Sequence, residues 1–302
     1  GVKQGDTVFC QDFTFIGSCD AILYEKAYPV FIDSEPNSWN MSPAALEKAF
    51  QWAKANNRMP KAVIICDLYG ESADWDRLLP ICRKYNVPVI EDAAEAVGTM
   101  YKSKRCGSFG DISALSFNGN KILTTSGGGM VLSNNTMAIE KMRFWSTQAR
   151  EPFVHYEHVE YGYNYRMSNI CACIGRGQLA FMPEKLQRRL NTHRAYKKAF
   201  EGMPVHIKST AERGSSNYWL NLLVIDDERV SPETIVTKLQ NAQIESRPAW
   251  KPMHMQPLFK DDIFVTDTDV YEKSSECIGN GKIVDEDIFN HALCLPSGDT
   301  LT

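Results

Sequence analysis

Lys121 and Asp92 are the two residues of this sequence whose surroundings most favour chemistry. Asp92 follows an apolar run, and Lys121 comes 29 residues later (121 − 92), between another apolar run and a glycine-rich loop. The nearest formal charges along the chain are Asp111 on one side and Glu140 on the other. Removal from water and charge favours the neutral lysine amine, which is the form that attacks a carbonyl carbon.

A neutral amine and a carboxylate are the two protein groups that pyridoxal phosphate chemistry requires. The lysine binds the cofactor as a Schiff base, and the carboxylate keeps the ring nitrogen protonated so that the ring accepts electrons. Lys121 and Asp92 match these two roles. Their spacing is equally compatible with a loop lysine and a turn-capping aspartate, because perturbed charged pairs are often structural.

Other common catalytic signatures are absent from the sequence. There is no G-x-x-x-x-G-K-[ST], no G-x-G-x-x-G after a strand, no H-E-x-x-H and no G-x-S-x-G. His155 and His158 lie three residues apart, but the six histidines as a set lack the spacing of metal ligands. We therefore expect no metal site.

The elements that must position these residues alternate between strands and helices. Apolar runs over 30–32, 62–66 and 87–90 predict buried strands, and helical periodicity over 43–53 and 75–82 predicts the intervening helices. Two strand–helix–strand units imply a parallel sheet with helices on both faces, which binds ligands at the carboxyl ends of its strands. Asp33, Asp67 and Asp92 each follow such a strand.

The second half of the chain changes in pattern. Further strands are predicted over 112–117 and 130–132, helices over 135–147 and 168–190, and then a strand over 219–225, a helix over 232–242 and a strand over 244–247. We expect a large α/β domain over residues 1–180 and a small α+β domain over residues 181–302.

Composition limits the possible classes of protein. The chain has 302 residues, of which 43% are hydrophobic and 23% charged, as in ordinary globular proteins. Its net charge of −4 gives no support to a nucleic-acid partner, and no apolar stretch approaches the length of a membrane span. Nine cysteines without a C-x-x-C pair predict reduced thiols in a cytoplasmic protein.

Eight segments, in order along the chain, resemble the signature of the DegT-type (DegT/DnrJ/StrS) sugar aminotransferases. They are residues 12–15, 29–33, 91–96, 108–111, 116–121, 124–130, 162–168 and 247–254. The resemblance implies a fold type I pyridoxal phosphate enzyme, with a three-layer, mainly parallel sheet domain and a small α+β C-terminal domain. It also implies a homodimer with the active site at the subunit interface.

The resemblance assigns roles to residues of the large domain. Lys121 would bind pyridoxal phosphate covalently and move a proton between the cofactor and the sugar carbon, and Asp92 would pair with the ring nitrogen. Glu95 would lie near the ring and its phenolic oxygen, and Phe15 would stack on the outer face of the ring. Ser116 would donate its hydroxyl to the cofactor phosphate.

Three further residues follow from the same resemblance. Asn164 would reach the cofactor phosphate of the neighbouring subunit. Arg247 and His254 would border the sugar-nucleotide pocket, although a surface arginine and a core histidine fit the sequence equally well. The family's N-terminal phosphate-binding segment and its C-terminal helix have no counterpart within residues 1–302. The chain therefore resembles a family member trimmed at both ends.

Segments 116–129 and 146–151 resemble one subgroup of this family. That subgroup aminates the 4-keto group of UDP-linked 6-deoxy-N-acetylhexosamines, such as UDP-4-keto-6-deoxy-GlcNAc, in bacterial glycan synthesis. The implied donor is L-glutamate, with a ping-pong mechanism. A pyridoxal phosphate sugar dehydratase is one alternative, but that branch replaces the lysine with histidine. The other alternative is a regulatory member that binds cofactor or sugar without turnover.

Overall fold

An eight-stranded sheet forms the centre of the computed structural model, which describes residues 1–210, 213–279 and 283–298. In spatial order its strands are β14 (Val270–Tyr271), β13 (Ile263–Val265), β2 (Tyr28–Ile32), β1 (Thr7–Gln11), β3 (Val63–Cys66), β4 (Val89–Asp92), β7 (Ile112–Ser116) and β8 (Gly129–Leu132). All neighbours are parallel except the two edge pairs, β13–β14 and β7–β8. The predicted mainly parallel sheet is confirmed.

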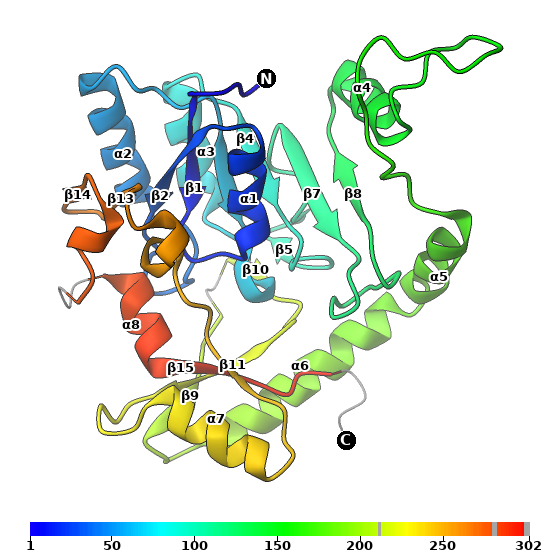
Figure 1. Cartoon of the computed structure of the whole chain (residues 1–302). Helices are drawn as coiled ribbons and strands as arrows, with labels where there is room; N and C mark the ends of the chain where they lie inside the picture. The colour runs from blue at the N-terminus through cyan, green and yellow to red at the C-terminus, as the bar shows by residue number, and fades with distance from the viewer. Residues whose placement is uncertain (211–212, 280–282, 299–302) are drawn as a thin grey trace.

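Helices cover both faces of this sheet (Figure 1). Helix α1 (Ile16–Tyr24) lies on one face, and α2 (Pro43–Ala55) and α3 (Trp75–Lys84) lie on the other. Helices α4 (Thr136–Ser146) and α5 (Asn169–Leu179) follow the edge strand β8 and have no buried residue. Strand β1 shows how the layers form, because alternate side chains of a strand point to opposite faces. Phe9 packs in one apolar cluster with residues of α2 and α3, whereas Val8 and Cys10 pack in another cluster with residues of α1. The result is the predicted three-layer arrangement.

Local sequence signals explain where several helices begin. The Ser42 side chain accepts a hydrogen bond from the Ala45 amide at 3.3 Å, and Pro43 occupies the first turn of α2. The helix predicted over 168–190 is instead two helices, α5 and α6 (Met182–Ala199). Pro183 lies in the first turn of α6, and because proline lacks an N–H group it favours a new helix start over continuation.

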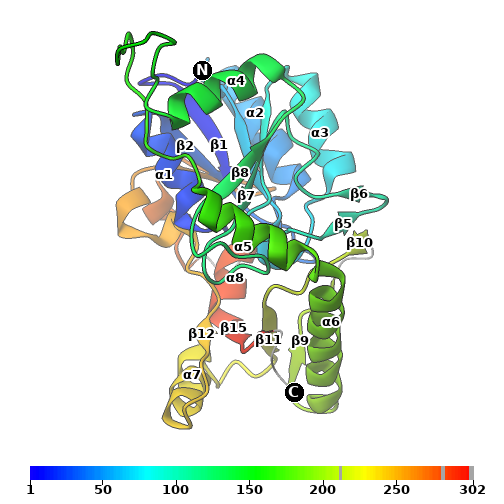
Figure 2. The same cartoon turned by 90° about the vertical axis from the view of Figure 1, so that its right-hand side faces the viewer.

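A second, smaller sheet lies below the main one (Figure 2). Its strands, in spatial order, are β12 (Arg247–Pro248), β15 (Ala292–Leu295), β11 (Asn221–Ile225) and β9 (Val205–Ile207), all antiparallel. Residues of α6 and α7 (Pro232–Asn241) pack on one face of it. Its other face joins α8 (Val284–His291) and aromatic residues of the main unit in a shared cluster.

The C-terminal segment does not stay within the small unit, although the predicted boundary placed residues 181–302 there. The three buried apolar residues of β13 pair in parallel with β2, and so extend the main sheet. The chain then returns through α8 to β15 in the small sheet. Periodicity did not reveal β13, because a three-residue strand is too short to show a pattern.

The remaining elements are short. They are β5 (Met100–Tyr101), β6 (Lys104–Arg105) and β10 (Gly214–Ser215), which form a three-stranded sheet, and the 3-10 turns η1 (Leu68–Gly70), η2 (Met253–Met255), η3 (Pro257–Phe259) and η4 (Ser274–Glu276). Within the described ranges, no helix has both the length and the apolarity needed to cross a membrane.

Candidate active site

A cavity of about 670 Å³ lies at the carboxyl ends of β1, β3, β4 and β7, opposite the ends of β12 and β15. Parallel α/β sheets bind their ligands at this edge. Six of the eight residues predicted for the site line the cavity: Phe15, Asp92, Glu95, Ser116, Lys121 and Arg247. The other two, Asn164 and His254, do not line it.

Lys121 lies in the loop between β7 and β8, with its side chain only 12% exposed. Its Nζ is 3.5 Å from Glu95 Oε1 and 4.0 Å from the ring centroid of Trp219. A carboxylate and an aromatic face both attract a positive charge. The sequence predicted that Lys121 has no charged neighbour, and this is wrong. The charged residues are distant from Lys121 along the chain, but folding brings Glu95 and Trp219 next to its amine.

Asp92 ends strand β4 and is held by three neighbours. The Ser18 hydroxyl donates to its Oδ2 at 2.5 Å, and the Ala94 amide donates to its Oδ1 at 3.1 Å. The Cys66 thiol lies 3.7 Å from Oδ2. These contacts fix the orientation of the Asp92 carboxyl group at the wall of the cavity.

Glu95 is positioned by the backbone of η1. The Tyr69 amide donates to its Oε2 at 2.6 Å, while Oε1 faces Lys121. Burial raises the pKa of Glu95 from 4.5 to about 7, against the opposing effects of Lys121 and the Tyr69 amide. A carboxyl group with this pKa exchanges protons near neutral pH. Glu95 and Lys121 thus form a pair between which a proton can move.

Glu91, the residue before Asp92, fixes the end of β4. It is fully buried, and its Oε2 accepts hydrogen bonds from the Phe109 and Gly110 amides and from the Ser113 hydroxyl, at 2.7, 3.0 and 2.7 Å. A Cβ atom at Gly110 would lie 2.8 Å from the Glu91 backbone nitrogen, so only glycine fits this close approach. The segment 108–111 therefore supports the strand that carries Asp92.

The other predicted residues at the cavity lie around its rim. Ser116 ends β7, and its Oγ accepts a hydrogen bond from the Asn118 amide at 3.3 Å. Phe15 precedes α1, is 60% exposed, and contacts Trp250 with ring centroids 5.7 Å apart. Arg247 begins β12 and pairs with Glu245 at 3.0 Å, with both side chains largely exposed. An aromatic face, a hydroxyl and a guanidinium thus border one cavity.

Asn164 and His254 lie elsewhere. Asn164 is in the exposed loop after α4, where its Oδ1 accepts a hydrogen bond from Gln148 Nε2 at 2.7 Å. His254 belongs to η2 and is fully buried between Asp12 and Glu286. Of the two readings of His254 that the sequence left open, a pocket border and a core histidine, the structure shows the core histidine.

Sequence reasoning missed the residues that approach the predicted pair from a distance along the chain. Ser18 is separated from Asp92 by 74 positions, and Trp219 approaches Lys121 from the small unit. The Trp219 indole N–H donates to the Asn120 carbonyl at 2.8 Å, which fixes its ring beside the lysine. Neither residue lies in a recognisable motif, so no sequence signal indicated them.

Comparisons with known proteins identify the class of enzyme. The pattern of the DegT/DnrJ/EryC1/StrS aminotransferase family matches residues 1–283, and the chain belongs to this family. EpsN of Bacillus subtilis, whose name places it among the pyridoxal phosphate-dependent aminotransferases, is 51% identical over all 302 residues and 75% of its own length. GDP-perosamine synthase of Caulobacter vibrioides is 35% identical over 88% of this chain and 72% of its own.

A solved structure supports the same family assignment. The crystal structure of a DegT DnrJ EryC1 StrS aminotransferase from Brucella abortus aligns with a TM-score of 0.86 and 26% identity, over 100% of this chain and 77% of that one. The fold type I class and the membership of the sugar aminotransferases, both expected from the sequence motifs, are confirmed. The protein is a pyridoxal phosphate-dependent sugar aminotransferase of this family.

The cavity residues fit pyridoxal phosphate. Lys121 would offer an amine for its carbonyl carbon, Asp92 a carboxyl group for its ring nitrogen, and Ser116 a hydroxyl for its phosphate. Phe15 offers an aromatic face at the rim. When bound, the cofactor supplies an electron sink that stabilises negative charge on the carbon next to the transferred nitrogen.

Proposed function

We propose that this enzyme transfers the amino group of L-glutamate to the 4-keto carbon of a nucleotide-linked 6-deoxy sugar, UDP-4-keto-6-deoxy-GlcNAc, in bacterial glycan synthesis. The reaction is ping-pong: glutamate leaves as its 2-oxo acid before the keto sugar accepts the nitrogen. One water supplies the oxygen of the 2-oxo acid and the carbonyl oxygen of the sugar leaves as water, so the two half-reactions balance without an external oxidant. The approach of Lys121 to Glu95, in one cavity with Asp92, carries the proposal.

The chain's own residues account for the proton movements. Lys121 Nζ gives or takes the proton at the reacting carbon, and Glu95 Oε1, 3.5 Å away, accepts the proton that Lys121 must release. With its pKa raised to about 7, Glu95 fits this role near neutral pH. Trp219 covers the amine at 4.0 Å, and so limits the access of water to it.

The substrate proposal draws on relatives and on the cavity rim. One relative, 30% identical over 85% of this chain and 68% of its own, is a UDP-4-amino-4,6-dideoxy-N-acetyl-β-L-altrosamine transaminase of Campylobacter jejuni. Arg247 at the rim offers a guanidinium suited to a nucleotide diphosphate. The cavity of about 670 Å³ is in the range of small-molecule sites.

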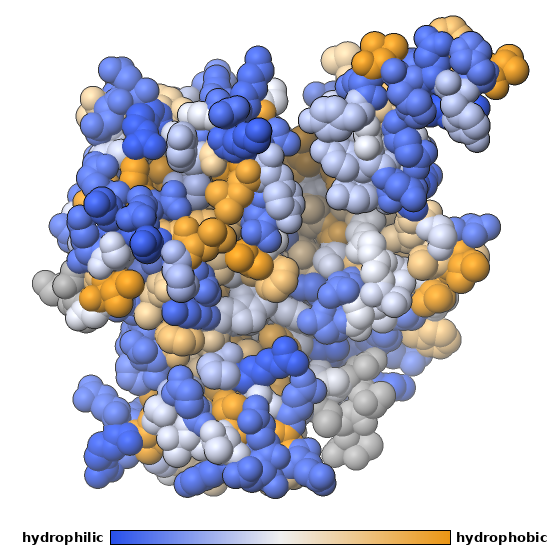
Figure 3. Space-filling view, viewed as in Figure 1, coloured by the Kyte–Doolittle hydropathy of each residue, from blue (hydrophilic) through white to orange (hydrophobic). Residues whose placement is uncertain are grey.

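The working form that we propose is a homodimer. Of the 23 large apolar side chains exposed within the described ranges, 15 lie between residues 130 and 181. Helices α4 and α5 in this segment have no buried residue, and α4 stands away from the main sheet (Figure 1). Apolar side chains are visible on the loop after α4 and around α5 (Figure 3). A second copy of the chain would cover this surface.

Asn164 lies on this proposed dimer surface, in the exposed loop after α4, and outside the cavity of its own chain. A dimer that buries the loop could bring Asn164 to the cofactor phosphate in the other subunit's cavity. We retain this role as part of the proposal.

An absorption spectrum of the cofactor-loaded protein, recorded with and without L-glutamate, tests the reaction type. We expect a visible band that moves to shorter wavelength with glutamate and returns when the keto sugar is added. Lys121→Ala should lose the visible band, while Lys84→Ala, which removes an exposed lysine paired with Glu47, should behave as wild type. A wild-type band that glutamate leaves unchanged would contradict the proposed donor.

Product analysis tests the substrate. We expect an amine at C4 of the sugar when UDP-4-keto-6-deoxy-GlcNAc is supplied with glutamate, and a lower kcat/KM with the GDP-linked 4-keto-6-deoxy sugar that lacks the N-acetyl group. Equal kcat/KM values for the two would contradict the assignment of the UDP sugar while leaving the aminotransferase class intact.

A further inference from the structure

A group of ionisable side chains is buried beside the cavity, behind the end of β1. Its members are Asp12, Asp33, His254, Cys277, Asp285 and Glu286, all at most 5% exposed. They come from the ends of β1 and β2, from η2 and α8, and from the residue that follows η4. Within this group only His254 can carry a positive charge.

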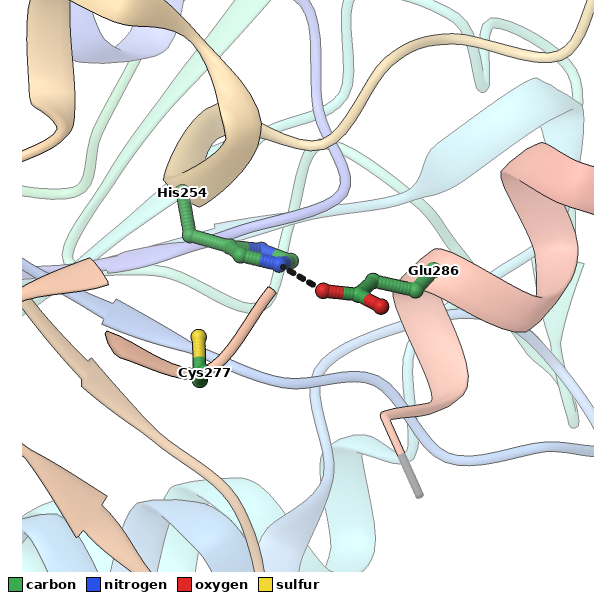
Figure 4. A group of neighbouring side chains, drawn as sticks. All are labelled: His254, Cys277 and Glu286. Carbon is green, nitrogen blue, oxygen red and sulfur yellow. Dashed lines mark hydrogen bonds and ion pairs between the residues drawn. The ribbon is translucent and has the colours of Figure 1, made fainter. Parts of the chain in front are cut away.

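His254 makes three contacts with two carboxylates. Its backbone amide donates to Asp12 Oδ1 at 2.7 Å, and its ring Nδ1 lies 2.6 Å from Asp12 Oδ2. The ring Nε2 faces Glu286 Oε1 at 3.3 Å (Figure 4). A neutral imidazole has one N–H group and can donate to only one of these carboxylates, whereas the imidazolium donates to both.

We propose that His254 is a positioning residue for the cavity: its imidazolium joins Asp12 to Glu286 and thereby holds Phe15 and Trp250 in place at the cavity rim. The inference rests on the proposed function of that cavity. His254 touches neither the cavity nor the cofactor residues, and it acts through the two chain segments that it connects.

The first segment is the turn between β1 and α1. The Asp12 carbonyl accepts hydrogen bonds from the Thr14 amide at 3.1 Å and from the Met253 amide at 3.2 Å. Thr14 and Phe15 line the cavity, and so does Trp250, four residues before His254. The Phe15 and Trp250 rings contact each other with centroids 5.7 Å apart. His254 is thus connected to this ring pair through Asp12 on one side and through its own chain segment on the other.

The second segment is α8. The Glu286 carboxylate accepts a hydrogen bond from the Gly279 amide, at 3.0 Å to Oε2, in addition to its contact with His254. Helix α8 leads directly into β15, and residues 294–298 at and beyond the end of β15 line the cavity. The charged group thus ties together chain segments on two sides of the cavity.

The surroundings stabilise the charged form of His254. Burial alone lowers the pKa of His254, but Asp12 and Glu286 outweigh it and raise the pKa to about 9. Asp33, Asp285 and Cys277 are the other titratable groups of this cluster, and burial raises the pKa of each. Burial favours the protonated forms of Asp285 and Cys277, whereas Asp33, with a pKa of about 7, ionises near neutral pH and adds a negative charge to the cluster. The Phe264 ring stacks on the imidazole at 4.2 Å and excludes water from one face.

A metal ion is the competing occupant. A ring nitrogen of His254, Cys277 Sγ and a Glu286 oxygen lie within 4.8 Å of one another, and a carboxylate on Nδ1 is common behind a metal-bound histidine. A metal would occupy Nε2 in place of the proton. The two occupants are therefore mutually exclusive, and an experiment can separate them.

The first experiment observes the ring directly, through long-range ¹H–¹⁵N NMR spectra of the cofactor-loaded, ¹⁵N-labelled protein, with metal content measured on the same sample. We expect one histidine with protons on both nitrogens from pH 6 to 8, and this signal should be absent from His254→Gln. A single protonated nitrogen on His254 at pH 7, or one equivalent of bound zinc, would overturn the proposal.

The second experiment tests the effect on the cavity, through the pH dependence of glutamate affinity and maximum rate in the glutamate half-reaction. Glu286→Gln keeps the size and one oxygen acceptor but removes the charge. In wild type we expect the affinity for glutamate to weaken above about pH 9, where His254 loses its proton. In Glu286→Gln we expect this loss about one pH unit lower, which corresponds to a tenfold weaker binding of the proton by His254. The rate at pH 7 should change less than twofold.

His206→Gln is the matched control, because His206 forms an exposed pair with Asp226 at 2.8 Å in the small sheet. Its affinity profile should match wild type, whereas identical profiles for wild type and Glu286→Gln would overturn the positioning role. If glutamate does not react at all, the proposed function fails, while the NMR spectra still decide the state of His254.

Discussion

Glu95→Gln tests whether burial controls the charge beside the reacting lysine. Glu95 is 7% exposed, and the pKa of its carboxyl rises from 4.5 to about 7 on folding. Because this pKa is higher in the folded protein, the folded state favours the protonated Glu95. Its contribution to folding stability is fully present below pH 4.5 and is lost as the pH rises through 7. Gln imitates the protonated carboxyl at every pH, and its side-chain oxygen can still accept the Tyr69 amide.

The size of the effect follows from the shift of about 2.5 units (7 − 4.5). At 1.36 kcal/mol for each unit, the ionised Glu95 costs about 3 kcal/mol relative to Gln once the pH is well above 7. For a chain of 302 residues this corresponds to roughly 5 °C in the melting temperature. We therefore expect Glu95→Gln to melt with wild type at pH 4.5 and roughly 5 °C higher at pH 8.5.

Thermal unfolding of the cofactor-free protein, followed by circular dichroism across this pH range, provides the measurement. Glu184→Gln is the control, because Glu184 is exposed and its pairing with Arg188 is loose, at 4.0 Å. It should follow wild type at both pH values. A Glu95→Gln curve that is parallel to wild type at every pH, or less stable at pH 8.5, would refute the reasoning.

Three further changes test the site and the proposed dimer. Asp92→Asn should lower the rate of the glutamate half-reaction at least 100-fold, because the ring nitrogen loses its charged partner, and stopped-flow absorption measures this rate. Trp219→Leu should lower the same rate about fivefold relative to Trp219→Phe, because Phe keeps an aromatic face beside Lys121 Nζ and Leu does not. Ile174→Lys should convert a dimer into monomers in sedimentation experiments, whereas Met59→Lys, at an exposed apolar residue outside residues 130–181, should not.

The main sheet could be predicted because its strands and helices carry their signals locally. Val63–Cys66 is an uninterrupted apolar run, and Ser42 with Pro43 marks the start of α2 in the sequence itself. Helix α1 and strand β13 were not predicted. Helix α1 has no side-chain cap and includes a glycine, and β13 gains its place only by pairing with β2, which lies about 230 residues earlier. Long-range pairing leaves no periodic trace in a short segment.

The candidate active site could likewise be predicted only in part. A strand end and a charge-free loop drew attention to Asp92 and Lys121, the resemblance to the family motifs gave them their predicted roles, and the structure places both at one cavity. The amine's actual neighbours, Glu95 and Trp219, could not be placed from spacing, because only the fold brings them within 3.5 and 4.0 Å of Nζ. Sequence therefore predicts which groups lie at the cavity, and tertiary structure determines which charged and aromatic groups surround them.

The cavity also depends on contacts between the two units. Lys121 comes from the main unit, whereas Trp219, which covers its amine, precedes β11 of the small sheet. Trp219 packs with Tyr69 and Trp250 in the apolar cluster that joins the two units, and its carbonyl accepts a hydrogen bond from the buried Arg189 at 2.8 Å. A change in how the units pack would therefore move the aromatic face away from the amine. It follows that substitutions in this joining cluster should alter the proton transfer at Lys121 even when they leave every group that contacts the cofactor in place.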